Sequence, residues 1–582
     1  MNPSKGARQV VEEWWPWVEM GDNGTVESIE AEEFLARCAR GETNFENGIL
    51  VHGNIDLRKH PLKNKIRKLP RALVKGSLFA DETCALEECE CNFEGDVSVD
   101  HSPLVRFGAK EGLLAKVQGI FSAKRCANLR DVRGFFNHDV HLDESGVEEV
   151  GRDFACQGGL YVGGCSRLKT LNCQAGSIHA ENSGLAEIGP DLEARFFVVD
   201  FCSNLKKVGA IKGLAWAGFS YSGIREITKD FQCAGPVKLL HCPDLKSVSG
   251  KMKRIDVDGV DRIERVEDLK ADEILFNLCK ELPAAFTRVD VTNLTFQQCG
   301  IVRIPNGIPA GAYVTIALCE RYSELPRHWK GDLCLIRLDS LQEIPRAFRC
   351  EGSLSVEDCE NLSQVAGEIK KDLNLMSGCA KLKNLGHGLF VGGKLRIFPS
   401  SGVENLDCRV GGMVEAMGCQ VRQTGDDFWV EGMANFRSCK RIKSLSGRVK
   451  GDTMLDESSI ISLGADFECE GRISLRSTKK LKVLNCVAGG DVHVAYSSLE
   501  KTGPAFHGKK WLYIEKCPKL RALGGRVEGD IRVDAGLGGS LLEEARVMLE
   551  GRYGHDKAGR KIGRAKEPMP KIPRSARKKA GI

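Results

Sequence analysis

The chain has 582 residues, of which 42% are hydrophobic and 28% charged, and it contains 64 glycines but only 19 prolines. This composition excludes a largely disordered chain and is typical of many regularly spaced turns. No stretch reaches the roughly 18 consecutive apolar residues of a membrane-spanning helix, and the N-terminus has no apolar secretory segment. We therefore expect a cytoplasmic protein whose 24 cysteines are reduced thiols, with signal-independent secretion left open.

Residues 1–48 are expected to form a helical N-terminal cap. The run from Ser28 to Arg40 predicts a short helix, with Ser28 as its N-cap and glutamates in the first turn. Trp14, Trp15 and Trp17 are expected to cover the open apolar end of the coils that follow, as an atypical terminal repeat does. The alternative for these tryptophans is an aromatic surface that docks a partner.

Residues 49–539 repeat a unit of about 20 residues roughly two dozen times. The template is G-x-L-x-V-x-x-C-x-x-L-x-x-L, as in GGLYVGGCSRLKTL (158–171) and GSLSVEDCENLSQV (352–365). Cysteine-bearing units tend to alternate with units such as GDVHVAYSSLEKTGPAF (490–506), which carry a small or polar residue in the cysteine position. The L-x-V alternation predicts a short strand with one buried face. Because one unit cannot bury that face alone, the units are expected to stack into a solenoid.

The template resembles the leucine-rich repeat, L-x-x-L-x-L-x-x-(N/C)-x-L, with Cys or Ser in the Asn/Cys ladder position. Segments such as IRKLPRALVKGSLFADE (66–82) and LQEIPRAFRCEGSLSVEDC (341–359) resemble the short bacterial and phage-type repeats. The resemblance implies a curved, mainly β solenoid of parallel strands that recognises partners through its concave face. A parallel β-helix with irregular third sides is the alternative fold.

The C-terminal end differs from the repeats. Residues 540–550 predict a short capping helix, and residues 551–582 predict a disordered basic tail. The tail has 11 Lys/Arg against Asp556 and Glu567, a balance of +9, so the rest of the chain carries 5 − 9 = −4. Such a tail can hold a nucleic-acid backbone or an acidic partner through its charge, or it can simply keep the chain soluble. Its candidate contact residues are Arg560, Lys561, Arg564, Lys566, Lys571, Arg574, Arg577, Lys578 and Lys579.

Most cysteines recur in two positions of the unit, which is what a core position predicts, since cysteine behaves as a small buried hydrophobe. Cysteines two coils apart lie about 10 Å from each other at a strand spacing of about 4.8 Å, too far for a disulfide. The irregular cluster is Cys84, Cys89 and Cys91, with His101 further on. Zinc is the alternative for this cluster, although it lacks the C-x2-C pairs of structural zinc sites.

The candidate site lies on the outward side of the strands. The middle residue of each L-x-V should point away from the core on the concave face, and three neighbouring units place His141, Tyr161 and His179 there. We expect these three residues to form a hydrogen-bonding aromatic contact patch, with plain solvated surface as the alternative. The other candidates in this row are Lys238, Arg396, His493, Tyr513 and Arg532, beside Asp56, Phe79, Asp256 and Glu415.

The sequence favours a non-enzymatic recognition scaffold that binds a protein partner. It contains no H-E-x-x-H or G-x-S-x-G motif, and we expect no metal or cofactor, although a catalytic set assembled across coils remains an alternative. The second hypothesis is a nucleic-acid-associated accessory protein that uses the basic tail. A host-targeted bacterial effector is a minor alternative. The pattern makes no prediction of oligomeric state.

Overall fold

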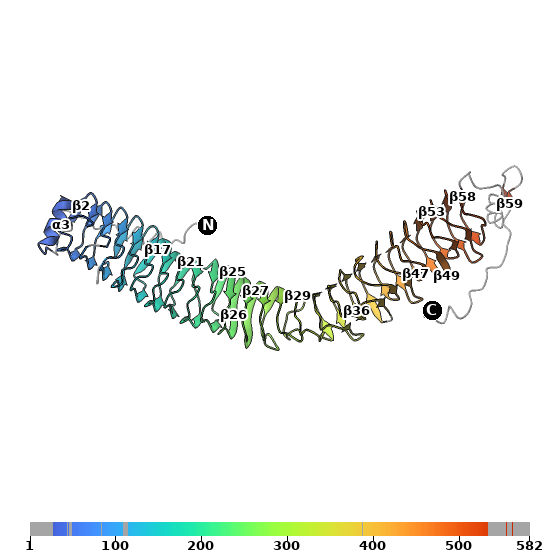
Figure 1. The fold of residues 1–582 in the computed structure, drawn as a ribbon, viewed down its shortest axis with the longest axis horizontal. Coiled ribbons are helices and arrows are strands. Elements are labelled where there is room, and N and C mark those ends of the chain that lie inside the picture. The colour runs from blue at the N-terminus through green and yellow to red at the C-terminus, as the bar shows by residue number, and fades with distance from the viewer. Residues whose placement is uncertain are drawn as a thin grey trace. The chain divides into compact units, whose positions relative to one another are not determined.

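The computed structural model describes residues 27–42, 45, 49–82, 84–108, 114–386 and 388–533, and the backbone of 554–555 and 561–562. These residues form a mainly β solenoid of about 25 coils with parallel strands, as the repeat predicts. Figure 1 shows the strands of successive coils lying side by side within each part of the chain. Two compact units divide the chain: Met1–Ile301 with Pro305–Pro309 (the N-terminal unit), and Val302–Ile304 with Ala310–Ile582 (the C-terminal unit).

In the N-terminal unit, every coil contributes to one parallel sheet, here named the strand face. Its strands are β1 (Glu27–Glu30), β2 (Ile49–His52), β3 (Ile55–Asp56), β5 (Leu73–Lys75), β6 (Leu78–Phe79), β8 (Asn92–Phe93), β9 (Val97–Ser98), β11 (Ala115–Val117), β12 (Phe121–Ser122), β14 (Gly134–Phe136), β15 (Val140–His141), β17 (Phe154–Tyr161), β19 (Gln174–His179), β21 (Glu193–Val198), β23 (Trp216–Gly218), β25 (Gln232–Leu240), β26 (Ser247–Asp258), β27 (Arg265–Asn277) and β28 (Asp290–Gln297). Shorter strands line a second side of the coils: β4 (Lys68–Leu69), β7 (Glu88–Cys89), β10 (Arg106–Phe107), β13 (Asp131–Val132), β16 (Glu149–Val150), β18 (Thr170–Leu171), β20 (Glu187–Ile188), β22 (Lys207–Val208) and β24 (Glu226–Ile227).

The C-terminal unit has the same plan. Its strand face comprises β29 (Tyr313–Ala317), β31 (Asp332–Ile336), β34 (Leu354–Glu357), β37 (Leu373–Leu375), β40 (Leu395–Ile397), β43 (Val414–Glu415), β46 (Ala434–Asn435), β48 (Thr453–Met454), β50 (Ile473–Arg476), β53 (Val492–Ala495), β56 (Leu512–Glu515) and β58 (Ile531–Val533). Its second side is a continuous sheet of β30 (His328–Trp329), β32 (Glu343–Ile344), β33 (Arg349–Cys350), β35 (Gln364–Val365), β36 (Gly367–Ile369), β38 (Asn384–Leu385), β39 (Leu389–Val391), β41 (Asn405–Leu406), β42 (Arg409–Val410), β44 (Gln423–Thr424), β45 (Trp429–Val430), β47 (Ser444–Val449), β49 (Ser462–Cys469), β51 (Val483–Leu484), β52 (Val487–Ala488), β54 (Lys501–Thr502), β55 (His507–Gly508) and β57 (Arg526–Val527).

The core is a stack of identical positions from successive coils. Val140, Leu160 and Ile178 pair across β15, β17 and β19, and none of the three has any exposed surface. Burying one such side chain contributes about 1.5–3 kcal/mol, so each coil is stabilised chiefly by its two neighbours. Because inward residues keep this register, the intervening outward residues of adjacent coils are also held side by side.

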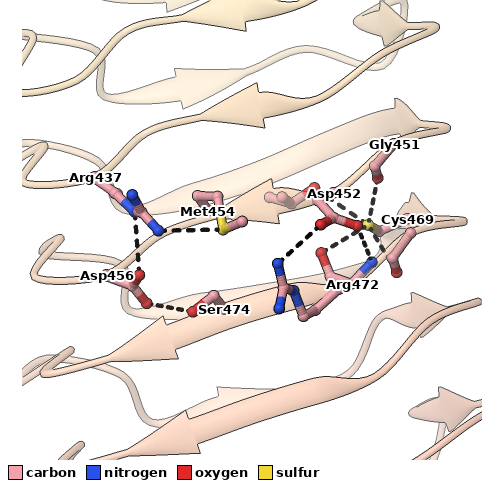
Figure 2. Close-up of polar contacts among 10 residues, drawn as sticks. Arg437, Gly451, Asp452, Met454, Asp456, Cys469, Arg472 and Ser474 are labelled. Carbon is pink, nitrogen blue, oxygen red and sulfur yellow. Dashed lines mark hydrogen bonds and ion pairs between the residues drawn. The ribbon is translucent and has the colours of Figure 1, made fainter.

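Acidic side chains tie successive coils together at the edges of the strand face. Figure 2 shows two of them in the C-terminal unit. Asp456 accepts hydrogen bonds from Ser474 Oγ at 2.6 Å and Arg437 Nε at 3.2 Å, and also from the backbone N–H of Arg476 at 2.9 Å. Asp452 accepts the backbone N–H of Arg472 at 2.8 Å, one coil further on. These carboxylates satisfy backbone donors that the sheet itself leaves free.

The chain turns from the strand face at a residue in the left-handed conformation, here named the corner residue. Asn182 (φ 53°) and Gly259 (φ 65°) hold this position with residue types that tolerate it. Phe201 (φ 59°), Tyr221 (φ 54°) and Leu278 (φ 52°) hold it without that tolerance. The left-handed conformation costs an ordinary side chain about 1–2 kcal/mol, so these corners store strain.

The N-terminal cap is in part different from the prediction. The helix is α3 (Ala31–Ala39), and its N-cap is Glu30, which makes no side-chain capping hydrogen bond. Ser28 is therefore not the N-cap: it lies in β1, pairs with Leu50, and its hydroxyl hydrogen-bonds His52 Nε2 at 2.7 Å. The strand pairing of β1 with β2 extends the sheet by one rung, which the helical pattern did not predict.

Several predicted end segments lie outside the described residues. These are the Trp14–Trp17 cluster, the capping helix at 540–550 and nearly all of the tail. Within 551–582, the structure describes only the antiparallel pair β59 (Gly554–His555) and β60 (Lys561–Ile562). Among the described residues, no helix is long and apolar enough to cross a membrane.

The cysteines form part of the core. All 24 are free thiols, and all except Cys334 are buried. Cys165 Sγ donates to the carbonyl oxygen of Leu142 at 3.0 Å and lies 3.5 Å from Ser145 Oγ, which occupies the same position one coil earlier. Cys469 Sγ, from the second cysteine position, contacts the carbonyl oxygen of Gly451 at 3.3 Å (Figure 2). Burial raises the pKa of the Cys469 thiol to about 11.

Candidate functional site

Three rings stack on the outward side of the N-terminal unit. His141, Tyr161 and His179 are direct partners in the register of β15, β17 and β19. The centroids of His141 and Tyr161 are 4.6 Å apart with planes 15° from parallel, and those of Tyr161 and His179 are 4.8 Å apart and 9° from parallel. Parallel strands are about 4.8 Å apart, so rings in one outward row meet at stacking distance. The predicted patch is thus one continuous ring stack.

Gly159 leaves the space that the ring of Tyr161 occupies. A Cβ atom added to Gly159 would lie 2.7 Å from Cε2 of Tyr161 and 3.0 Å from Ser177 Oγ. The phenol therefore lies over the backbone of its own strand, where only a residue without a side chain leaves room. The histidine side chains on either side remain 25% and 30% exposed, so the stack presents ring surface to solvent.

Carboxylates surround the stack. Asp143 Oδ2 lies 3.9 Å from His141 Nδ1, and Glu181 Oε1 lies 3.5 Å from His179 Nδ1. Asp139 accepts the backbone N–H of Gly159 at 2.7 Å. The pKa of Tyr161 is raised, first by burial and then by the negative charges of Asp139, Asp143 and Glu181. The stack consequently lies in a negative electrostatic potential.

The structure does not unite the other predicted residues with this stack. Lys238 lies on β25 of the same unit, where its register neighbours are Gly218 and Asp256. Arg396 in the C-terminal unit forms an ion pair with Glu415 at 2.8 Å, which neutralises its charge. The register neighbours of both residues, Gly218 and Asp256 for Lys238 and Asn374 and Glu415 for Arg396, carry no rings, so neither residue extends the stack.

A second ring group lies in the C-terminal unit. His493 and Tyr513 stack at 4.4 Å and 16°, and Trp511 lies 5.7 Å from Tyr513 at 11°. The guanidinium carbon of Arg532 is 5.3 Å from the centre of the Trp511 ring, within cation–π range. The pKa of His493 is lowered, first by burial and next by Arg476. His493, Tyr513 and Arg532 thus follow one another in the register of β53, β56 and β58, and their role as a contact surface stays a prediction.

Of the predicted tail residues, the structure describes only the backbone of Lys561. The remaining eight, Arg560, Arg564, Lys566, Lys571, Arg574, Arg577, Lys578 and Lys579, lie outside the described residues. Contact of the tail with nucleic acid or an acidic partner stays a prediction.

The structure also places an aromatic column that the sequence reasoning missed. The corner residues Phe201, Tyr221 and His241 follow one another in three successive coils. The first two rings are 4.9 Å apart and 1° from parallel, and the second pair is 5.0 Å apart at 29°. Phe201 and Tyr221 are 56% and 52% exposed. The available signal was an aromatic residue directly before the ladder Cys or Ser in three consecutive units.

The cysteine cluster near the N-terminus makes ordinary core contacts. Cys84 Sγ donates to the carbonyl oxygen of Ala80 at 3.1 Å, and Cys91 Sγ to that of Pro70 at 2.9 Å. Cys89 is buried in β7, and His101 is an exposed corner residue with φ 57°. Within the described ranges, no group of three or more His, Cys, Asp or Glu side chains is placed to hold a metal ion.

The chain was compared with protein families, curated proteins and solved structures. No protein-family model matches the chain, and no curated protein matches it. The chain is similar to the solved structure of YopM from Yersinia enterocolitica WA-314, with 13% identity over 90% of this chain and 99% of that chain and a TM-score of 0.15. A TM-score of this size supports no conclusion about function. The functional argument therefore rests on the residues of the strand face.

Proposed function

We propose that this chain is a non-enzymatic recognition scaffold that binds a protein partner through the strand face of its N-terminal unit. The observation that carries the proposal is the stack of His141, Tyr161 and His179, whose rings are held in register and partly exposed. Aromatic side chains are enriched at the energetic centres of protein interfaces because they offer large contact area at small entropic cost. A preordered stack loses little further entropy when a partner binds.

The repeat supports the same proposal at the level of the fold. Each coil adds about 4.8 Å of sheet, so the strand face offers a long row of outward side chains rather than one enclosed cavity. We assign the chain to leucine-rich-repeat-like proteins of the short bacterial or phage type, with Cys and Ser in the ladder position. The contacts of Cys165 with Leu142 and Ser145 support this assignment. The free, buried thiols fit a cytoplasmic protein.

Affinity capture from a lysate of the source cells tests the proposal. The full chain is compared with the triple variant His141→Ala, Tyr161→Ala, His179→Ala and with a matched triple variant, Thr295→Ala, Thr315→Ala, Ser355→Ala. The matched residues occupy the equivalent outward strand position in other coils and are half-buried, but they carry no rings. We expect one partner to be retained by the wild type and the matched variant and lost from the stack variant. Equal capture by all three would refute the proposal.

A further inference from the structure

The ring stack belongs to a larger surface of the N-terminal unit, which we name the acidic aromatic face. It joins the stack of His141, Tyr161 and His179 to the corner column of Phe201, Tyr221 and His241. Phe196 and Trp216 come from the coils that also carry Phe201 and Tyr221, five residues before these corners; Phe196 pairs with Ser177 on β19 and with Trp216 on β23. Phe196 is 41% exposed.

At more than one place on this face a ring leans along its own strand over a glycine. A Cβ atom on Gly218 would lie 2.7 Å from Cη2 of Trp216, just as a Cβ on Gly159 would meet Tyr161. Glycine therefore clears the backbone beneath both rings. Within each stack the rings turn their π faces, the negative side of an aromatic quadrupole, toward one another, and Phe196 is a ring of this surface over which a cation lies.

The corner column lowers the stability of the fold, because its residues adopt a strained backbone conformation. Phe201 and Tyr221 combine the left-handed conformation with more than half of their surface exposed. The adjacent corners Asn182 and Gly259 avoid this strain, whereas Arg125 and Glu144 accept it, so the exposed aromatic side chains are what sets Phe201 and Tyr221 apart. Neither burial nor backbone preference accounts for aromatic residues at these corners. Contact with a partner does account for them.

The charge on this face identifies the chemistry of the partner. Asp139, Asp143, Glu181 and Asp200 lie among the rings, and in the described part of the chain none of the four has a Lys or Arg partner. Asp139 and Asp200 accept the backbone N–H groups of Gly159 and Ser220 at 2.7 and 2.6 Å, which fixes their positions. The carboxylates are thus ordered but carry no neutralising Lys or Arg.

The fold already places a cation on this surface once. The guanidinium carbon of Arg195 lies 5.5 Å from the centre of the Phe196 ring. Unneutralised carboxylates beside partly exposed rings favour guanidinium and ammonium groups, through charge and, as at Phe196, through cation–π attraction. We infer that the acidic aromatic face binds a lysine- or arginine-rich segment of the partner protein; this inference rests on the proposed recognition function.

The test uses the full chain and a fluorescein-labelled peptide of five Arg-Gly dipeptides, with binding followed by fluorescence anisotropy at low and at physiological ionic strength. The ring variant is Phe201→Asn with Tyr221→Asn, because asparagine accepts the left-handed corner. The charge variant is Asp143→Asn with Glu181→Gln. Thr295→Ala with Thr315→Ala serves as the matched control. We expect about tenfold weaker binding for each of the first two variants, a weaker salt dependence for the charge variant, and no change for the control.

Each other outcome overturns the inference. Absence of peptide binding, or equal affinity in all variants, would remove the site. Loss in the charge variant alone would show that the rings take no part, and loss in the ring variant alone would show that Asp143 and Glu181 do not attract the cationic peptide. The proposed function fails separately: it is refuted if partner capture survives the His141, Tyr161 and His179 substitutions. If capture depends on these residues but the peptide does not compete with the partner, the function stands and only its cationic chemistry is wrong.

Discussion

The rings of Phe201 and Tyr221 lie 4.9 Å apart and within 1° of parallel, although both residues hold a left-handed backbone conformation. The stack follows from the solenoid itself, because equivalent residues of adjacent coils are placed about one strand spacing apart. The conformation does not follow from the residue type, since phenylalanine and tyrosine disfavour it. At these two corners the repeat accounts for the stacking of the rings, and backbone preference does not account for the aromatic residue type.

Relief of corner strain can be measured at Leu278, which has φ 52°, is 43% exposed and lies outside the ring column. We expect Leu278→Asn to raise the free energy of unfolding by about 0.5–1 kcal/mol, because asparagine tolerates the left-handed region. Urea unfolding followed by circular dichroism provides the measurement. Leu275→Asn, on the extended strand of the same coil, is the control and should bring no gain. A lower stability of Leu278→Asn than of wild type would contradict the strain argument.

The close contact between Gly159 and the Tyr161 ring predicts the effect of adding a methyl group at Gly159. Gly159→Ala should displace the phenol from between His141 and His179, since the new Cβ would lie 2.7 Å from the ring. We expect an altered near-ultraviolet circular dichroism signal and weakened partner capture, with the far-ultraviolet signal unchanged. Gly151→Ala is the matched control, because nothing lies within 4 Å of its added Cβ. A ring signal that is the same in both variants would speak against the stack.

Removal of one inter-coil carboxylate should be costly. Asp456 accepts hydrogen bonds from Ser474, Arg476 and Arg437, and its side chain is only 17% exposed. Asp456→Ala leaves these donors unpaired and is expected to lower the free energy of unfolding by about 1–3 kcal/mol. Exposed Asp466 supplies the control substitution, which should change stability by less than about 0.5 kcal/mol. Equal effects of the two substitutions in urea unfolding would disprove the role of Asp456.

The buried thiols predict a loss of stability in mild alkali. Burial raises the pKa of Cys350, Cys439 and Cys469 to about 11, whereas an unfolded thiol titrates near about 8.5. The folded state holds these protons more tightly, so their stabilisation is complete below about pH 8.5 and is lost as the pH rises towards 11. Each thiol contributes a fall of about 1.4 kcal/mol per pH unit in that window.

Urea unfolding at several pH values between 8 and 11 measures this slope. Cys439→Ala should make it shallower by the share of one thiol, because Cys439 is fully buried and its Sγ donates to the carbonyl oxygen of Ala416. Ser438→Ala, at the half-buried corner residue directly before Cys439, should leave the slope unchanged. A stability that does not fall above pH 8.5 would contradict the pKa values assigned to the buried thiols.

The strand face was predictable because its signal is short-ranged. Leu160 and Val162 enclose Tyr161 in an L-x-V pattern, and the same pattern in the next coil places His179 beside it. The ring stack then follows from register alone. The two-residue strands of the second side were not predictable, since a pair such as Glu343–Ile344 is too short to show any periodicity.

Local preference also misled the reasoning at two places. Ser28 is a better N-cap than Glu30, yet pairing of β1 with β2 holds Ser28 in a strand and moves the helix start to Ala31. At the corners, backbone preference favours glycine or asparagine, so an aromatic residue such as Tyr221 gives no conventional turn signal. In both cases the stacked neighbours, which are remote in sequence, decide the local conformation.

Because the register is fixed, equivalent outward side chains of the strand face are spaced by one strand separation per coil. Removing one whole coil between two contact positions would bring them closer by about 4.8 Å without rotating either side chain away from the face. Removing a single residue would instead reverse the inward and outward sides of a strand such as β17 and would expose Leu160. The distance between contact side chains on the strand face can therefore change by insertion or deletion of whole coils, but not by insertion or deletion of single residues.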